Sequence, residues 1–111
     1  MEDCLFCRIV AGKLPATVVY EDDDVVAIKD VFPRAPFHVL VVPRTHVAML
    51  SDLDDEPLGG RLLQAVRRVA RGGGVGDSFR LVVNNGDQAG QSVWHLHLHV
   101  LGGREFSWPP G

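Results

Sequence analysis

One ten-residue segment, from Ser92 to Leu101, constrains the fold more than any other part of the chain. Within it, three histidines alternate with apolar residues, giving the order His95, Leu96, His97, Leu98, His99, Val100. Successive side chains of a β-strand point to opposite faces of a sheet, so this alternation predicts a strand with a core face and a histidine face. Neighbouring histidines would lie roughly 6.6 Å apart, because a strand rises about 3.3 Å per residue.

The other elements follow from periodicity and from turn residues. Residues 4–11 predict a short helix, because Phe6, Ile9 and Val10 share a face and Gly12 follows. The β-branched runs 17–20 and 25–28 flank an acidic turn and predict a hairpin. Residues 38–42 and 79–83 predict two further strands, the first of which Pro43 would end.

Residues 54–71 carry the pattern of one long helix. Acidic residues and Pro57 occupy its first turn, where the helix dipole and the missing amide are tolerated, and three glycines follow its end. Apolar residues recur at helical spacing, at Leu58, Leu62, Val66 and Val69. Taken together, the elements predict an α+β fold, in which about five antiparallel strands pack with one long and one short helix.

Length and charge limit the classes of function. The chain has 111 residues, which predicts one domain spanning residues 1–111. The net charge is −3, and the basic residues form no cluster, so the sequence argues against nucleic-acid binding. No apolar run reaches the roughly 20 residues that a membrane span needs, and the acidic start lacks the features of a signal peptide. We therefore expect a cytoplasmic protein without a membrane partner.

A polar, glycine-bearing loop, residues 84–92, leads directly into the histidine segment. Its amides, together with Gln91 and the Ser92 hydroxyl, could cradle phosphate oxygens, although such loops are often only turns. A neutral imidazole is a good nucleophile near pH 7, so the histidines and this loop suit attack on phosphorus. Two other interpretations remain at this point, a polar sheet surface and a metal site with several of the histidines on one ion.

The two cysteines, Cys4 and Cys7, stand three positions apart. In a reducing compartment this spacing indicates a metal half-site or a redox pair rather than a structural disulfide. Unpaired thiols on a short helix are an equally good interpretation of the spacing alone. His46, which follows Pro43 by three positions, has no evident role in a core.

The histidine segment resembles the signature of the histidine-triad nucleotide-binding family, and specifically its phosphoramidase branch. That signature alternates histidine and apolar residues and ends in two apolar residues, as positions 95–101 do here. The likeness extends to residues 35–46, to the loop 90–94, and to the C-terminal stretches 101–104 and 108–111. The resemblance implies a HIT-like fold, whose sheet extends across a homodimer.

The resemblance also implies an activity, which is hydrolysis of purine nucleoside phosphoramidates and of aminoacyl-adenylates to AMP. His97 would attack the α-phosphate and form a nucleotidyl-histidine intermediate. His99 would bind phosphate oxygens, Ser92 would help to hold the phosphate and ribose, and His38 would face the same pocket. By its hydroxyl chemistry alone, Ser92 could also supply or relay a proton to the leaving group. Trp108 would reach toward the active site of the partner subunit. The full set of nucleotide-binding positions implied in this way is Ile28, Asp30, Val31, Asn84, Gly90, Gln91, Ser92, His97, His99 and Trp108.

A structural zinc ion is implied by relatives that combine a Cys-x-x-Cys motif with a Pro-x-x-His motif. The matching ligands here are Cys4, Cys7, His46 and His95. Two cysteines and two histidines make the tetrahedral set that zinc prefers in structural sites, with no position left open for water. The resemblance therefore implies a structural zinc and no catalytic metal.

Three alternatives remain open, and the sequence departs from the family at two positions. Dinucleoside polyphosphate hydrolysis is disfavoured because Val93 stands where that branch carries glutamine. A zinc-stabilised nucleotide-binding or adaptor module without turnover is a second alternative, and a metalloenzyme with all three triad histidines on one ion is a third. Trp94 and Ser107 differ from the residues of better-known relatives, so the preferences for base and leaving group stay open.

Overall fold

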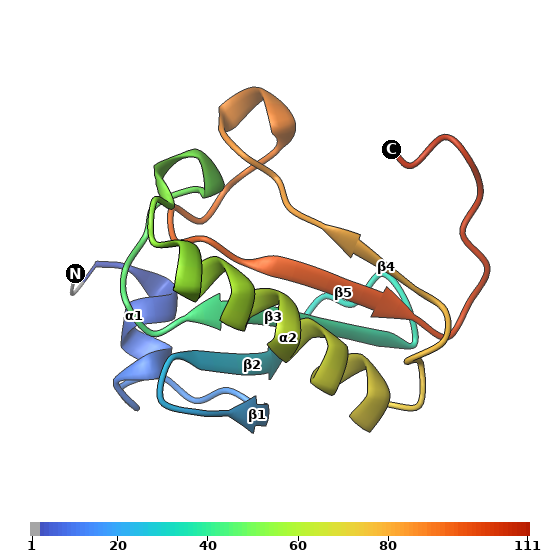
Figure 1. Cartoon of the computed structure of the whole chain (residues 1–111), viewed down its shortest axis with the longest axis horizontal. Helices are drawn as coiled ribbons and strands as arrows, with labels where there is room; N and C mark the ends of the chain where they lie inside the picture. Colours follow the sequence, from blue (N-terminus) through green and yellow to red (C-terminus); the bar gives the residue numbers. More distant parts are fainter. Residues whose placement is uncertain (1–2) are drawn as a thin grey trace.

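The structure is a computed structural model and describes residues 3–111; Met1 and Glu2, part of the acidic start, lie outside the described residues. Five strands form one antiparallel sheet in the order β1-β2-β3-β5-β4 (Figure 1). In chain order, the elements are α1 (Leu5–Val10), β1 (Val18–Glu21), β2 (Val25–Lys29), β3 (Phe37–Pro43), α2 (Glu56–Gly72), β4 (Phe79–Val82) and β5 (Leu98–Gly102). The predicted α+β fold, with five strands, one long helix and one short helix, is confirmed.

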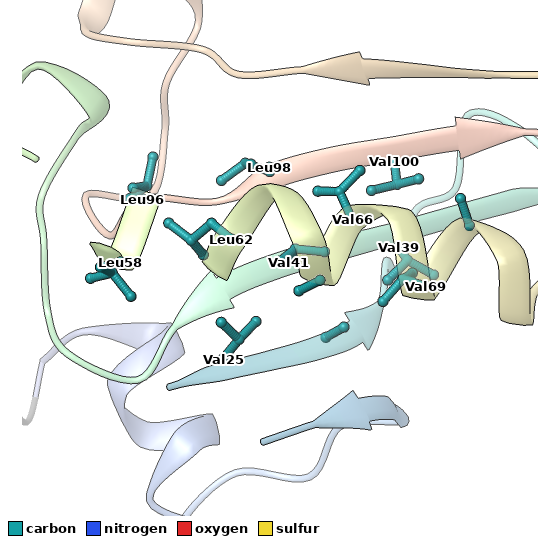
Figure 2. Packing of buried hydrophobic residues seen from close by; sticks show 13 residues of the cluster. Val25, Val39, Val41, Leu58, Leu62, Val66, Val69, Leu96, Leu98 and Val100 are labelled. Atoms are coloured by element: carbon teal, nitrogen blue, oxygen red, sulfur yellow. The ribbon is translucent and has the colours of Figure 1, made fainter. Parts of the chain in front are cut away.

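The long helix α2 covers one face of the sheet and builds the main core. Its first turn is capped by the Asp55 side chain, which accepts a hydrogen bond from the Leu58 amide at 3.0 Å. Figure 2 shows its apolar side chains directed at those of the central strands. The four apolar positions predicted from the periodicity are all buried there, namely Leu58, Leu62, Val66 and Val69.

The two helices lie on opposite faces of the sheet. Phe6 of α1 packs against the face that α2 does not cover, with apolar residues of β2 and β3, namely Val26, Ile28, Leu40 and Val42. Strands β2 and β3 are therefore buried on both faces, which explains why their sequences read as continuous apolar runs rather than as alternating ones.

The strand predicted over residues 92–101 is too long, because β5 begins only at Leu98. In the register of the β3–β5 pair, Val41 faces Leu98, so Leu96 would face Pro43. Proline has no amide hydrogen, so the ladder cannot continue there. The Leu96 amide instead donates to the Val47 carbonyl at 2.7 Å. The alternation of faces nevertheless persists, because Leu96, Leu98 and Val100 all enter the core beneath α2.

Two short 3-10 turns, Leu50–Asp52 and Asp87–Ala89, were not predicted. The second lies in the loop before the histidines and ends at Gly90, whose φ of 93° is a left-handed conformation that glycine adopts without strain. Within residues 3–111, the structure contains no helix of the length and apolarity that a membrane crossing requires.

Replacement of Leu62 by alanine tests the core beneath α2. Leu62 is 2% exposed, whereas its neighbour Leu63 on the same helix is 53% exposed. We expect Leu62→Ala to lower the free energy of unfolding by about 2–5 kcal/mol, because the buried methyl groups leave a cavity. Leu63→Ala, the matched control, should change it by less than about 0.5 kcal/mol. Urea denaturation measures both values, and equal losses would contradict this packing.

Candidate functional site

A cavity of about 600 Å³ lies on the sheet face opposite α2. Its walls come from α1, from the segment that follows α1, from the end of β2 and from the histidine segment. Most lining residues are apolar, and the polar ones are Lys29, Asp30, Ser92, His97 and His99. An apolar cavity with a few convergent polar groups is the usual form of a small-molecule site.

His97 presents an unprotonated ring nitrogen to this site. Its Nδ1 lies 2.8 Å from the carbonyl oxygen of His95. A carbonyl oxygen only accepts hydrogen bonds, so Nδ1 carries the proton and Nε2 keeps its lone pair. The side chain is 8% exposed and lines the cavity. This backbone contact thus leaves the lone pair of Nε2 available, which is the state that a nucleophilic imidazole requires.

His99 presents an N–H donor rather than a lone pair, because a chain of hydrogen bonds places its proton on Nε2. The backbone amide of Arg34 donates to Nδ1 of His38 at 3.0 Å, so the proton of His38 is on Nε2. That Nε2–H faces Nδ1 of His99 at 3.0 Å. His99 therefore accepts at Nδ1 and carries its own proton on Nε2. The side chain lines the cavity, and its Nε2–H is a donor suited to an oxyanion.

Burial keeps His38 and His99 neutral. Desolvation, with smaller contributions from His97 and His38, lowers the pKa of His99 to about 4. Burial also lowers the pKa of His38, although the Asp30 carboxylate, 3.4 Å from its Nε2, acts in the opposite direction. Neutral imidazoles at pH 7 are what both the hydrogen-bond chain and a nucleophilic mechanism require.

The loop before the histidines contributes Ser92 to the cavity, and Gln91 shapes the loop itself. The Gln91 side chain is buried and bonded only to backbone, since Nε2 donates to the carbonyls of Ala48 and Val93 and Oε1 accepts from the Gly86 amide. Ser92 is exposed and lines the cavity. Asn84, Gly90, Gln91 and Trp108 are not among the residues that line it in this single chain.

Cys4, Cys7, His46 and His95 converge beside the cavity, with their ligand atoms all within 4.8 Å of one another. Nδ1 of His95 lies 3.3 Å from Cys4 Sγ and 3.5 Å from Cys7 Sγ, and Nδ1 of His46 lies 3.3 Å from Cys7 Sγ. Nε2 of His95 faces the Pro43 carbonyl at 2.8 Å and so carries the proton, which leaves Nδ1 free to bind a metal. The donor set and the tautomer both fit zinc.

The electrostatics of the four-residue cluster also favour a bound divalent cation. Burial, together with the neighbouring Cys4 thiol, raises the pKa of Cys7, because two thiolates in contact repel each other. Burial lowers the pKa of His95, which keeps its ring neutral. A divalent cation would relieve the repulsion between the thiolates, and neutral imidazoles are the form of histidine that binds one.

Asp30, His38 and His99 form a second cluster of possible ligands, but their hydrogen bonds do not fit a metal ion. The Arg34 amide occupies Nδ1 of His38, so the Nε2 that faces the cluster is protonated and has no lone pair to donate. Among the described residues, no group of possible ligands brings His95, His97 and His99 together. The geometry therefore opposes the alternative in which these three histidines bind one ion.

Several cavity residues were not predicted from the sequence. Phe6 and Ile9 come from α1, and Leu14, Pro15 and Ala16 come from the segment after it. The helical periodicity indicated that Phe6 and Ile9 share a face. It did not indicate that this face closes a cavity over the histidines, because that depends on where α1 docks.

Comparisons with known proteins identify close relatives of the chain. The sequence model of the HIT domain matches residues 11–106. An uncharacterized HIT-like protein of Synechocystis is 53% identical over 99% of this chain and 98% of its own length. A HIT family hydrolase from Legionella pneumophila is 43% identical, with a TM-score of 0.94 over 98% of this chain and 100% of that one. A zinc-bound histidine triad family protein from Mycobacterium smegmatis is 39% identical, with a TM-score of 0.79 over 93% and 76% of the two chains.

The lowered pKa of His99 predicts how stability depends on pH. Between about 4 and the ordinary value of 6.5, the unfolded chain binds more protons at this histidine than the folded protein does. The free energy of unfolding should therefore fall as the pH drops from 6.5 toward 4. Urea midpoints of chelator-treated protein measure this fall without a contribution from metal loss. His99→Asn should show a shallower dependence, and equal slopes for the two proteins would contradict the prediction.

Proposed function

The chain belongs to the HIT domain family, and from this premise we propose that it is a nucleotide hydrolase acting on purine nucleoside phosphoramidates. It cleaves their P–N bond and releases AMP through an intermediate on His97. The observation that carries the proposal is the unprotonated Nε2 of His97 in the cavity, beside the N–H donor of His99. The Legionella pneumophila relative, a HIT family hydrolase, supports the reaction class.

The reaction takes two steps at phosphorus. Nε2 of His97 attacks the α-phosphorus, a P–N bond to the imidazole forms, and the bond to the amine breaks. The Ser92 hydroxyl, which lines the cavity, relays a proton from solvent to the departing amine. The Nε2–H of His99 donates to a phosphoryl oxygen as charge develops. Water then attacks phosphorus, its proton passes to solvent, and AMP leaves with His97 restored.

The cavity offers a place for each part of an AMP-type ligand. The base packs among apolar side chains that include Ile28 and Val31, and the Asp30 carboxylate accepts from the ribose hydroxyls. The phosphate lies at Ser92, His97 and His99. Gln91 acts indirectly, because its side chain holds the loop 84–92 in shape. Asn84 and Gly90 belong to the same loop. Aminoacyl-adenylates fit the same scheme, with a P–O bond broken in place of P–N.

A structural zinc ion bound by Cys4, Cys7, His46 and His95 belongs to the proposal. The zinc-bound relative from Mycobacterium smegmatis supports it, together with the convergence of the four ligands. Two thiolates neutralise the charge of the ion, so it adds little net field at the phosphate. With four protein ligands the ion has no open position for water, and no catalytic metal is needed.

We also propose a homodimer that acts in the cytoplasm, as a single HIT domain. Strand β4 is an outer strand of the sheet, so its free edge offers backbone groups for pairing with a second copy. Trp108 is 83% exposed on the C-terminal segment after β5, which curves back toward β4 (Figure 1), where Arg80 donates to the Ser107 carbonyl at 2.9 Å. In a dimer, this side chain reaches the site of the partner subunit.

His97→Ala should abolish the release of AMP from adenosine phosphoramidate, with a loss of at least about a thousandfold in kcat. Wild-type protein quenched during turnover should carry an AMP adduct on the peptide that contains His97, detected by mass spectrometry at neutral pH. Ser92→Ala should slow the reaction, and the exposed Ser78→Ala is its matched control. Wild-type protein that binds AMP without turning over any purine phosphoramidate would favour a non-catalytic module.

Elemental analysis tests the metal. Purified wild-type protein should hold about one zinc per chain, and Cys4→Ser should hold much less, because a ligand is lost. His99→Asn, outside the four ligands, should keep its zinc. Brief chelation should lower the thermal midpoint while AMP release at saturating substrate persists. Activity that disappears on chelation and returns with added metal would instead favour a catalytic ion.

A further inference from the structure

Phe6 lies between the cysteine–histidine cluster and the nucleophile. Its ring centroid is 5.8 Å from that of His95, in an edge-on arrangement, and 5.1 Å from that of His97. The side chain is 3% exposed, and it also lines the cavity. One aromatic ring thus touches a proposed metal ligand, the proposed nucleophile and the space assigned to the nucleotide.

The helix that carries Phe6 has little to hold it in place by itself. It has six residues, and Phe6 is its one buried side chain. A helix this short is not stable on its own, because each terminal turn lacks hydrogen-bond partners. Cys4 is its N-cap and Cys7 lies in its first turn, so both thiol ligands flank Phe6 within four consecutive residues. Whatever fixes these two sulfur atoms also fixes the position of the Phe6 ring.

We propose that Phe6 is a positioning residue through which metal binding at Cys4, Cys7, His46 and His95 and nucleotide binding in the cavity favour each other. The inference rests on the proposed function for the identity of the two ligands. An ion at the cluster fixes the helix N-terminus, and Phe6 then holds the cavity wall and the His97 ring in place. A nucleotide packed against the same wall makes the helix harder to release, which retains the ion.

Thermodynamic linkage makes the proposal quantitative. If zinc lowers the dissociation constant of AMP by some factor, AMP must raise the affinity for zinc by the same factor. We expect roughly a tenfold effect, within the range of about 5–150-fold that is usual for coupled sites. Phe6→Leu, which removes the ring and keeps an apolar side chain, should bring the factor close to one while both ligands still bind.

Two binding measurements on the full chain test the coupling. Calorimetry gives the dissociation constant of AMP for zinc-loaded and chelator-stripped protein. Equilibrium competition with a chelator of known affinity gives zinc binding with and without AMP, and it starts from the loaded protein even if the stripped form unfolds. Phe32→Leu is the matched control, because Phe32 also lines the cavity but is an exposed side chain of the loop after β2. It should keep the factor, whatever it does to the affinity for AMP itself.

A spectroscopic signature separates positioning from general stabilisation. The Phe6 ring lies beside His97, so removal of zinc should move the Cε1 proton resonance of His97 in wild type and much less in Phe6→Leu. Zinc affinity that AMP does not change, or a coupling factor that Phe6→Leu preserves, would overturn the coupling and leave the hydrolase proposal intact. Failure of the zinc-loaded protein to bind AMP at all would overturn the proposed function, and the coupling with it.

Discussion

The hydrogen bond from Nδ1 of His97 to the carbonyl oxygen of His95 is the interaction on which the site depends. It exists because that carbonyl is not used by the sheet. Strand β5 begins after His97, since Pro43 of β3 has no amide with which to continue the ladder. The Pro43 carbonyl in turn accepts from Nε2 of His95. Pro43 therefore ends the β3–β5 ladder before the histidines and supplies the carbonyl that orients His95, the proposed metal ligand.

The three histidines share one sequence pattern but present different groups. In each ring, one nitrogen has a partner within the protein, and that partner decides whether the other nitrogen carries a lone pair or a proton. His95 directs the lone pair of Nδ1 at two thiols, His97 directs the lone pair of Nε2 into the cavity, and His99 directs an N–H there. The side-chain alternation is the same for all three. The partners differ: His95 contacts the Pro43 carbonyl, His97 contacts the His95 carbonyl, and His99 contacts the His38 ring. Tautomer, more than position along the segment, distinguishes His97, the proposed nucleophile, from its neighbours.

Local periodicity in the sequence predicted which faces of the elements are buried. It did not predict features that depend on long-range contacts. Helical spacing identified the buried face of α2, and alternation identified Leu96, Leu98 and Val100 as core residues. The start of β5, the docking of α1 opposite α2, and the bracing role of Gln91 were not predictable in the same way. Each depends on a partner more than thirty positions distant, such as Pro43 or Ala48, and no local pattern specifies such a partner.

The helix α1 has only one buried side chain, yet it forms a wall of the cavity, and the proposed metal gives a reason for the two cysteines in and beside its first turn. A core large enough to hold α1 would have to fill the space that a ligand needs, because Phe6 faces both. The proposed metal would offer another anchor, since it would hold the N-terminal turn of the helix through the side chains of Cys4 and Cys7 and leave the cavity open. An anchor of this kind stabilises the helix without adding apolar volume, so stability and an open binding site become compatible in a chain of 111 residues.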